Sequence, residues 1–294
     1  MGIKMKQLLK WGLSYILLSF IALLFLLQFN VTEILTRTTS AKADKVVTKK
    51  TVTASDNSVI NQLYEAMLNR ESTFTLKCKN PKEIYNKLNN EELFLEVSDI
   101  DNPSTSDDYD YLYNNIDSYT ITTVKNGVHV KLKWLEDKEQ LEQVNQKIES
   151  IIEETGARNM TSDYEKAKIL HDYIINITDY DYTCEKYTAF NAIFNQSTVC
   201  QGYSLLYYKL LTEVDVECRF ITGYSDNEYH GWNLVKIGNY WYNVDVTWDD
   251  LENNSISHDY FLKGSSNFNK DHKRDTRFDT DAFHKLYPTA VNNY

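Results

Sequence analysis

Proline, glycine and cysteine are all scarce in this sequence. Three prolines and nine glycines in 294 residues argue against a linker-rich array and favour compact, regular structure. Four cysteines are too few for a disulfide scaffold. Basic residues are outnumbered as well, with 31 against 42 acidic ones and a formal net charge of -11. This charge argues against nucleic acid or an anionic membrane as the main partner.

The N-terminal segment contains a long run without charged residues. Three lysines precede this apolar run over residues 11–31, and its length of about 21 residues is enough to span a bilayer as a helix. The tripeptide Ala41-Lys42-Ala43 has the small-x-small form of a signal peptidase site. We therefore expect residues 1–43 to be a signal peptide or a single-pass membrane anchor, with both alternatives open, and residues 44–57 to be a polar tether. In either case the remainder is expected outside the cytoplasm, secreted or anchored to the cell membrane.

Residues 58–158 mix helical and strand patterns and contain no pattern that carries chemistry. The pair Asn126-Gly127 is typical of a tight hairpin turn. The aromatic and acidic stretch over residues 109–119 is predicted to be a half-buried strand, with a binding edge as the alternative. A small α/β domain is therefore expected here. Its predicted elements are helices over 59–67, 81–90 and 137–154 and strands over 72–78, 118–125 and 127–134.

The stretch NQSTVCQGYSLLYYKLL, residues 195–211, places apolar and aromatic side chains at helical spacing after Cys200. Ser197 and Thr198 are residue types that accept hydrogen bonds from the first N–H groups of a helix. Cys200 is thus predicted to begin a buried helix, where the dipole favours an anion and a thiol tends toward the thiolate that attacks carbonyl carbon. Gly202 would keep the first turn open to a close approach. A small buried apolar cysteine is the alternative.

About thirty residues further on, YHGWNLVKIGNYWYNVDVTWDD predicts a β-hairpin. A tight turn at Gly238-Asn239 places His230 diagonally across from Asp245 on the same face of the hairpin. Asp245 can then orient His230, and His230 can take a proton from Cys200. The predicted strands cover residues 229–237 and 240–248, preceded by a strand over 216–224.

The motifs CQGY, CRFITGY, HGWNLV and WYNVDVTWDD occur in that order. Together they resemble the transglutaminase-like superfamily of papain-related enzymes over roughly residues 167–262. The resemblance implies a papain-like α+β domain in which the helix bearing the nucleophile packs on an antiparallel sheet. It also implies that Cys200 is the nucleophile, His230 the general base and acid, and Asp245 the orienting carboxylate.

The resemblance further implies a side chain upstream of the cysteine that helps a backbone N–H hold the oxyanion. Tyr182 is the first candidate for this role and Asn191 is the alternate.

Other titratable residues are expected to be structural. His171, on a predicted helix ending near Ile177, has no second ligand at i+3 or i+4 and is predicted to be a hydrogen-bonded histidine rather than a metal ligand. Asp249 and Asp250 lack the calcium-loop pattern and are predicted to be solvated turn charges. Buried free thiols are favoured over one disulfide among Cys78, Cys184 and Cys218, and no role is assigned to His258, His272 and His284.

We therefore expect an α+β chain in which residues 159–294 form a transglutaminase-like catalytic domain. The expected function is that of an extracytoplasmic cysteine enzyme that acts on carboxamide or peptide bonds through a thioester. Hydrolysis by a peptidase or amidase is favoured over protein-glutamine acyl transfer, and a catalytically silent surface binding module is the alternative. The expected partner is a protein or peptide substrate, with the cell envelope as one source, and no cofactor, metal or nucleic acid is expected.

Overall fold

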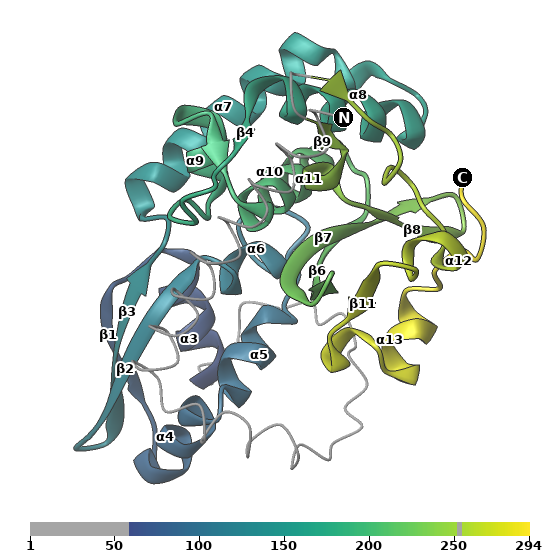
Figure 1. Ribbon diagram of the computed structural model, residues 1–294. Coiled ribbons are helices and arrows are strands. Elements are labelled where there is room, and N and C mark those ends of the chain that lie inside the picture. Colours follow the sequence, from purple (N-terminus) through teal and green to yellow (C-terminus); the bar gives the residue numbers. More distant parts are fainter. Residues whose placement is uncertain (1–58, 252–254) are drawn as a thin grey trace. The chain divides into compact units, whose positions relative to one another are not determined.

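The computed structural model describes residues 59–251 and 255–294 as a mixture of helices and strands (Figure 1). The α+β class expected from the sequence is therefore confirmed. The predicted signal peptide or anchor and the predicted tether lie outside the described residues. Among the described residues, no helix combines the length and apolar character that a membrane crossing requires.

A three-stranded antiparallel sheet with the order β1-β3-β2 forms the first part of the described chain. Helices lie beside it (Figure 1) and share one hydrophobic cluster with it, which includes Leu63, Leu76 and Val130. The predicted hairpin is confirmed, because Val124 pairs with Gly127 across the turn. The elements are α3 (Val59–Leu68), β1 (Thr73–Lys77), α4 (Pro81–Asn89), α5 (Glu92–Ser98), β2 (Ile116–Val124) and β3 (Gly127–Trp134).

Residues 109–115 of the aromatic and acidic stretch are not in the strand that the sequence predicted, whereas residues 116–119 begin β2 and are strand as predicted. The first part forms a short helix, α6 (Asp110–Tyr113), in which Asp110 is buried. Oδ2 of Asp110 accepts hydrogen bonds of 2.7 Å from Nε of Arg219 and from the N–H of Phe220, both in β6 (Cys218–Ser225). A buried carboxylate requires such partners, and they come from a distant part of the chain.

Helices surround α10 in the second part of the chain. The apolar side chains of α10 are buried on every side of the helix, as is typical of a core helix. Asp137 and Gln140 form a capping box at the start of α7, and α7 contributes to the same hydrophobic cluster as α8 and α10. The domain boundary predicted at residue 158 stays a prediction. The helices are α7 (Lys138–Thr155), α8 (Asp163–Ile177), α9 (Ala189–Phe194) and α10 (Cys200–Glu213).

A four-stranded antiparallel sheet with the order β11-β6-β7-β8 packs against α10. The predicted hairpin turn is confirmed, since Ile237 pairs with Tyr240. The second strand ends at Val244 rather than Trp248, because the Asp245 side chain caps a single helical turn, α11 (Val246–Asp249). β8 (Tyr240–Val244) and β11 (His272–Arg274) are the edge strands, and β7 (Glu228–Ile237) lies between β6 and β8.

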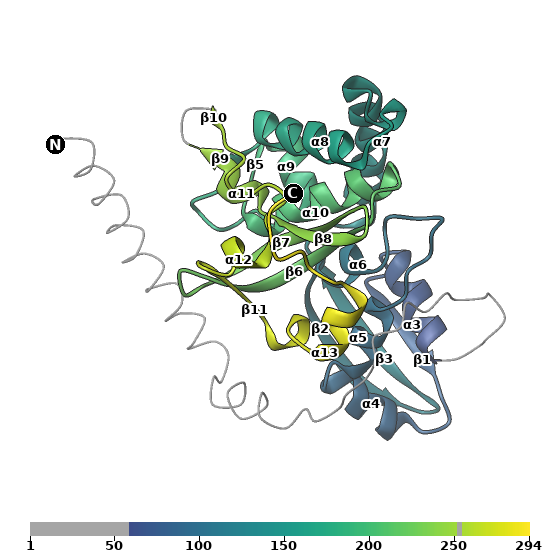
Figure 2. The ribbon, with the colours of Figure 1, turned by 90° about the vertical axis from the view of Figure 1, so that its right-hand side faces the viewer.

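The C-terminal segment returns to this sheet. Its strand β11 pairs with β6, and Figure 2 shows this yellow segment beside β6. Phe268, Phe278 and Phe283 pack against Trp232 in a separate hydrophobic cluster. The remaining elements are β4 (Asp179–Tyr180), β5 (Ser197–Thr198), β9 (Asp250–Leu251), β10 (Ser255–Ile256), α12 (Ser265–Phe268) and α13 (Asp281–Leu286).

Candidate active site

Cys200 is the first residue of α10, as the sequence predicted, and its side chain is partly exposed. The predicted capping by Ser197 or Thr198 is wrong, because Val199 occupies the cap position and no side chain bonds there. The Thr198 hydroxyl instead donates to the carbonyl of Lys186 at 2.9 Å. The first N–H groups of α10 therefore lack a capping side chain, and such groups are ready donors to an anion next to Cys200.

Gly202 allows a close approach to the start of α10, but the group that approaches is another part of the chain and not a substrate. A Cβ at this position would lie 1.9 Å from Oγ1 of Thr198 and 2.8 Å from the carbonyl oxygen of Thr188. The glycine is thus required by the packing of the chain against itself. This contact fixes the segment that leads into Cys200.

His230 and Asp245 form a buried pair beside Cys200, as the hairpin register predicted. His230 lies on β7 and is 8% exposed, and Asp245 is fully buried. Nε2 of His230 donates to Oδ2 of Asp245 over 2.6 Å. The other carboxylate oxygen accepts from the N–H groups of Thr247 and Trp248 at the start of α11. Asp245 is therefore held by the backbone while it orients the imidazole.

The charges of this site favour a protonated imidazole. Burial lowers the pKa of His230, but the Asp245 carboxylate, the Cys200 thiolate and hydrogen bonds to both outweigh burial and hold that pKa well above its ordinary value. Burial raises the pKa of Asp245, yet His230 and His272 bring it well below its usual range. An imidazolium placed between a carboxylate and a thiol is the arrangement that cysteine nucleophiles use.

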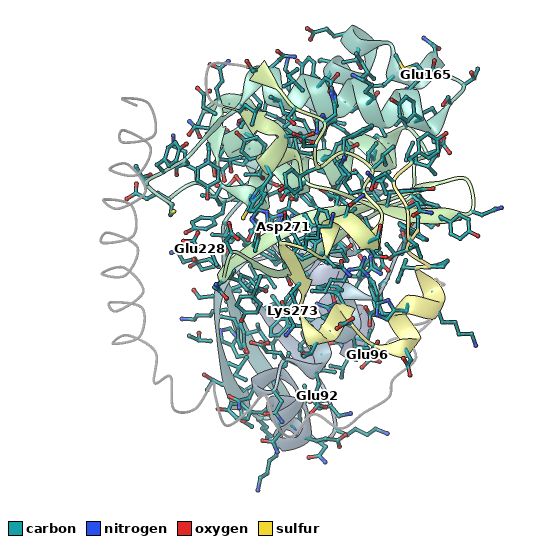
Figure 3. All side chains as sticks on the ribbon, turned by 45° about the vertical axis from the view of Figure 1, so that its right-hand side comes forward. Glu92, Glu96, Glu165, Glu228, Asp271 and Lys273 are labelled. Carbon is teal, nitrogen blue, oxygen red and sulfur yellow. The ribbon has the colours of Figure 1, made fainter. Side chains whose placement is uncertain are left out.

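His272 is a member of the site that the sequence analysis left without a role. It is fully buried at the start of β11, where Nε2 lies 3.0 Å from the same oxygen of Asp245 that bonds His230. Its Nδ1 lies 2.6 Å from Oδ1 of Asp271. Figure 3 labels Asp271 and Lys273, which precede and follow His272 in the chain. The chain separates His272 from Asp245 by 27 positions, and only the pairing of β11 with β6 brings them together.

Aromatic rings enclose these charged groups. Trp232 is fully buried and its ring stacks near His230, with the ring centroids 6.2 Å apart. The Trp248 ring lies 6.1 Å from His230 and 4.7 Å from His272. Trp232 is thus a core residue, and the partly buried Trp248 lies beside both histidines. Large flat side chains exclude water, which strengthens the interaction between the charges that they surround.

The two side chains proposed for the oxyanion have other contacts. Tyr182 is 71% exposed and packs its ring edge-on against Tyr180. Asn191 accepts from two backbone N–H groups at the start of α9, as part of a capping box. Their oxyanion role stays a prediction. Tyr180, in contrast, interacts electrostatically with Cys200. Burial raises the pKa of Tyr180, and the negative charge of Cys200 raises this pKa further.

The other predicted features have mixed outcomes. All four cysteines are free thiols, as expected, although only Cys218 is buried. His171 is hydrogen-bonded, as predicted. The prediction for Asp249 is wrong, because this carboxylate is fully buried and its Oδ2 lies 3.2 Å from Nε2 of His171. Asp250 also has a side-chain partner, because it accepts a hydrogen bond from the Tyr203 hydroxyl at 2.5 Å.

Comparison with known proteins connects this geometry to a family. The model of the transglutaminase-like superfamily matches residues 151–246. A structure described as a TGase is 15% identical with a TM-score of 0.36, and the match covers 47% of this chain and 46% of that one. A candidate cysteine protease from Cytophaga hutchinsonii is 18% identical with a TM-score of 0.32, and the match covers 44% of this chain and 61% of that one. A search of curated proteins gives no match. The chain contains a transglutaminase-like superfamily domain, which includes Cys200, His230 and Asp245.

Proposed function

We propose that this chain is a cysteine-dependent enzyme that acts on carboxamide or peptide bonds through a thioester. The observation that supports this most directly is the buried pair of His230 and Asp245, joined at 2.6 Å beside Cys200 at the start of a helix. Three groups in these roles are what acyl transfer requires: a nucleophile, a proton carrier and a group that orients the carrier.

In the proposed first half-reaction, the Cys200 sulfur attacks the carbonyl carbon of the substrate. The oxygen becomes an oxyanion near the N–H groups that begin α10. The carbon–nitrogen bond then breaks, and the leaving nitrogen takes the proton of His230. The products are ammonia or an amine and a thioester on Cys200.

In the second half-reaction, neutral His230 takes a proton from the group that attacks the thioester. Attack by water releases a carboxylic acid, whereas attack by an amine forms a new amide. Either attack breaks the carbon–sulfur bond and restores the ion pair of Cys200 and His230. We propose hydrolysis as the main reaction and amine transfer as the alternative outcome.

The proposed substrate is a protein or peptide outside the cytoplasm, with the cell envelope as one source. This location depends on the N-terminal lysines and the apolar run over residues 11–31. It is independent of the chemistry at Cys200, so a different location would leave the proposed reaction unchanged.

The test is the alkylation of the full chain by iodoacetamide, followed by mass spectrometry at each cysteine between about pH 5 and 9, a range that brackets the ordinary histidine and cysteine pKa values. Fast modification of Cys200 is expected, and His230→Ala should slow it. Cys184 is a matched control, since it is also a partly exposed free thiol. Equal, slow modification of all four cysteines would reject the enzyme and favour a silent binding module.

A second assay separates the two reactions. Dimethylated casein is incubated with the protein and a primary amine, and both peptide cleavage and amine incorporation are measured. Both signals should disappear in Cys200→Ala and persist in Cys184→Ala. Cleavage or amine incorporation that persists in Cys200→Ala would place the chemistry elsewhere.

A further inference from the structure

A second cluster of histidines and carboxylates lies outside the candidate active site. His171 and Asp172 are neighbours on α8, and His258 follows β10. Oδ1 of Asp172 lies 2.9 Å from Nδ1 of His171 and 2.7 Å from Nε2 of His258. One ligand atom from each residue lies within 4.8 Å of the other two. His258 is 86 positions from Asp172 in the chain. Local spacing in the sequence therefore could not indicate this cluster.

The second ring nitrogen of His171, Nε2, has the kind of partner that metal-binding histidines require. Nε2 of His171 lies 3.2 Å from Oδ2 of Asp249, and both side chains are fully buried. Oδ1 of Asp249 accepts from the N–H of Tyr260 at 2.9 Å. A carboxylate on the second nitrogen fixes the tautomer and the orientation of a histidine ligand. Asp249 therefore directs Nδ1 of His171 toward Asp172.

Two of the three ligand separations are close to those around a small tetrahedral ion, and all three ligand atoms lie within 4.8 Å of one another. Two zinc ligands at about 2.0–2.1 Å from the ion lie about 3.3 Å from each other. The observed separations of 2.9 Å and 2.7 Å are shorter by about half an ångström, which side-chain rotation can supply. Lys168 bonds the other oxygen, Oδ2, of Asp172, so Oδ1 remains the ligand atom.

The cluster is also accessible from solvent. The side chain of His258 is 39% exposed and that of Asp172 is 20% exposed, whereas His171 is fully buried. An ion can thus enter on the His258 side and find a preformed, buried ligand behind it. Water can complete the coordination on the open side.

We propose that His171, Asp172 and His258 bind a divalent transition-metal ion of the zinc type. Two imidazoles and a carboxylate are a ligand set that suits zinc. The ion joins α8 to the segment after β10, and through Asp249 it also secures the end of α11. The other end of α11 is capped by Asp245, so the ion stabilises the element that carries the orienting carboxylate of the active site.

The test is zinc binding by the full-length protein after removal of metal with a chelator. Equilibrium dialysis against zinc sulfate with elemental analysis should find one zinc ion per chain, and zinc should raise the melting temperature. His258→Ala should abolish binding without unfolding the protein, because this side chain is partly exposed. His284→Ala is the matched control: His284 is 46% exposed and also bonds a single aspartate, Asp279. This variant should bind zinc like the wild type.

Two further variants identify the site. Asp249→Asn should weaken zinc binding by about 10–100-fold, the usual effect of a lost second partner of a ligand histidine. Cys200→Ala should bind zinc normally, because the active-site thiol is not a ligand. Three results would each overturn the proposal: no zinc binding by the wild type, unchanged binding by His258→Ala, or loss of binding in Cys200→Ala.

Discussion

Two buried histidines in this protein face aspartates at opposite ends of the same helical turn. His230 bonds Asp245, which caps the start of α11, and His171 bonds Asp249, which ends it. What differs is the third partner. Cys200 lies beside His230, whereas His171 faces Asp172 and a second histidine. The same histidine–carboxylate pair can therefore support proton transfer or ligand geometry, depending on the group opposite the ring.

The two clusters share a second feature, in which two histidines approach one carboxylate oxygen. In the first cluster Oδ2 of Asp245 meets His230 and His272, and all three residues are buried. In the second, Oδ1 of Asp172 meets two rings, one of them 39% exposed. All three members of the first cluster are buried, while the second includes a partly exposed histidine. Exposure thus distinguishes the two clusters as much as composition does.

The largest expected effect compares the two aspartates at the ends of α11. Asp245→Asn should reduce casein turnover on the order of 10⁴-fold, the size seen when a triad loses its orienting carboxylate. Asp249→Asn should leave turnover within about tenfold, because the Asp249 side chain bonds His171 and the N–H of Tyr260 and not a group of the reaction. It should instead lower the free energy of unfolding by about 1–3 kcal/mol, the effect of a weakened buried hydrogen bond to a charged group. Equal losses of turnover in both variants would remove the distinction between the clusters.

A smaller effect is expected at His272, which acts on the reaction through Asp245. His272→Ala removes a hydrogen bond to the buried carboxylate, worth about 1.5–3 kcal/mol, so turnover should fall by roughly 10–100-fold. The position of the basic limb of the pH–rate profile should also move, since His272 lowers the pKa of Asp245 and so affects the charge facing His230. His272→Gln keeps a donor and should restore part of the turnover. If His272→Ala and the wild type had equal melting temperatures and the same pH–rate profile, this positioning role would be contradicted.

The smallest expected effect is a pH dependence of stability at His171. Burial lowers the pKa of His171, but hydrogen bonds to Asp172 and Asp249 outweigh burial and raise it above its ordinary value. The charged ring therefore stabilises the fold fully below about pH 6.5, the ordinary pKa of histidine, and this contribution is lost as pH rises through the higher folded value. In chelator, the melting temperature of the wild type should approach that of His171→Gln above about pH 6.5. A constant difference would show that the charge of His171 contributes nothing.

The helix that begins at Cys200 and the hairpin of β7 and β8 could be predicted because their signals are local. Apolar spacing defines the helix, and Gly238-Asn239 fixes the register that places His230 near Asp245. The family resemblance depended on the same segments, and the match over residues 151–246 confirms it.

The features that were missed depend on partners far along the chain. Asp110 is held in α6 by β6, 109 positions away, and this contact overrides a strand-like pattern. Asp249 was predicted to be a solvated charge, although its partner His171 lies 78 positions away. In both cases a distant partner offsets the cost of burying a carboxylate.

The α+β class, the helix start at Cys200 and the hairpin that brings His230 to Asp245 follow from local patterns, because periodicity and turn residues act over a few positions. The contact of His272 with Asp245 and that of His258 with Asp172 depend on the folding of the whole chain. Those contacts require the return of the C-terminal segment to β6 and of the segment after β10 to α8. Long-range pairings of this kind are set by the packing of whole elements, and no local pattern specifies them.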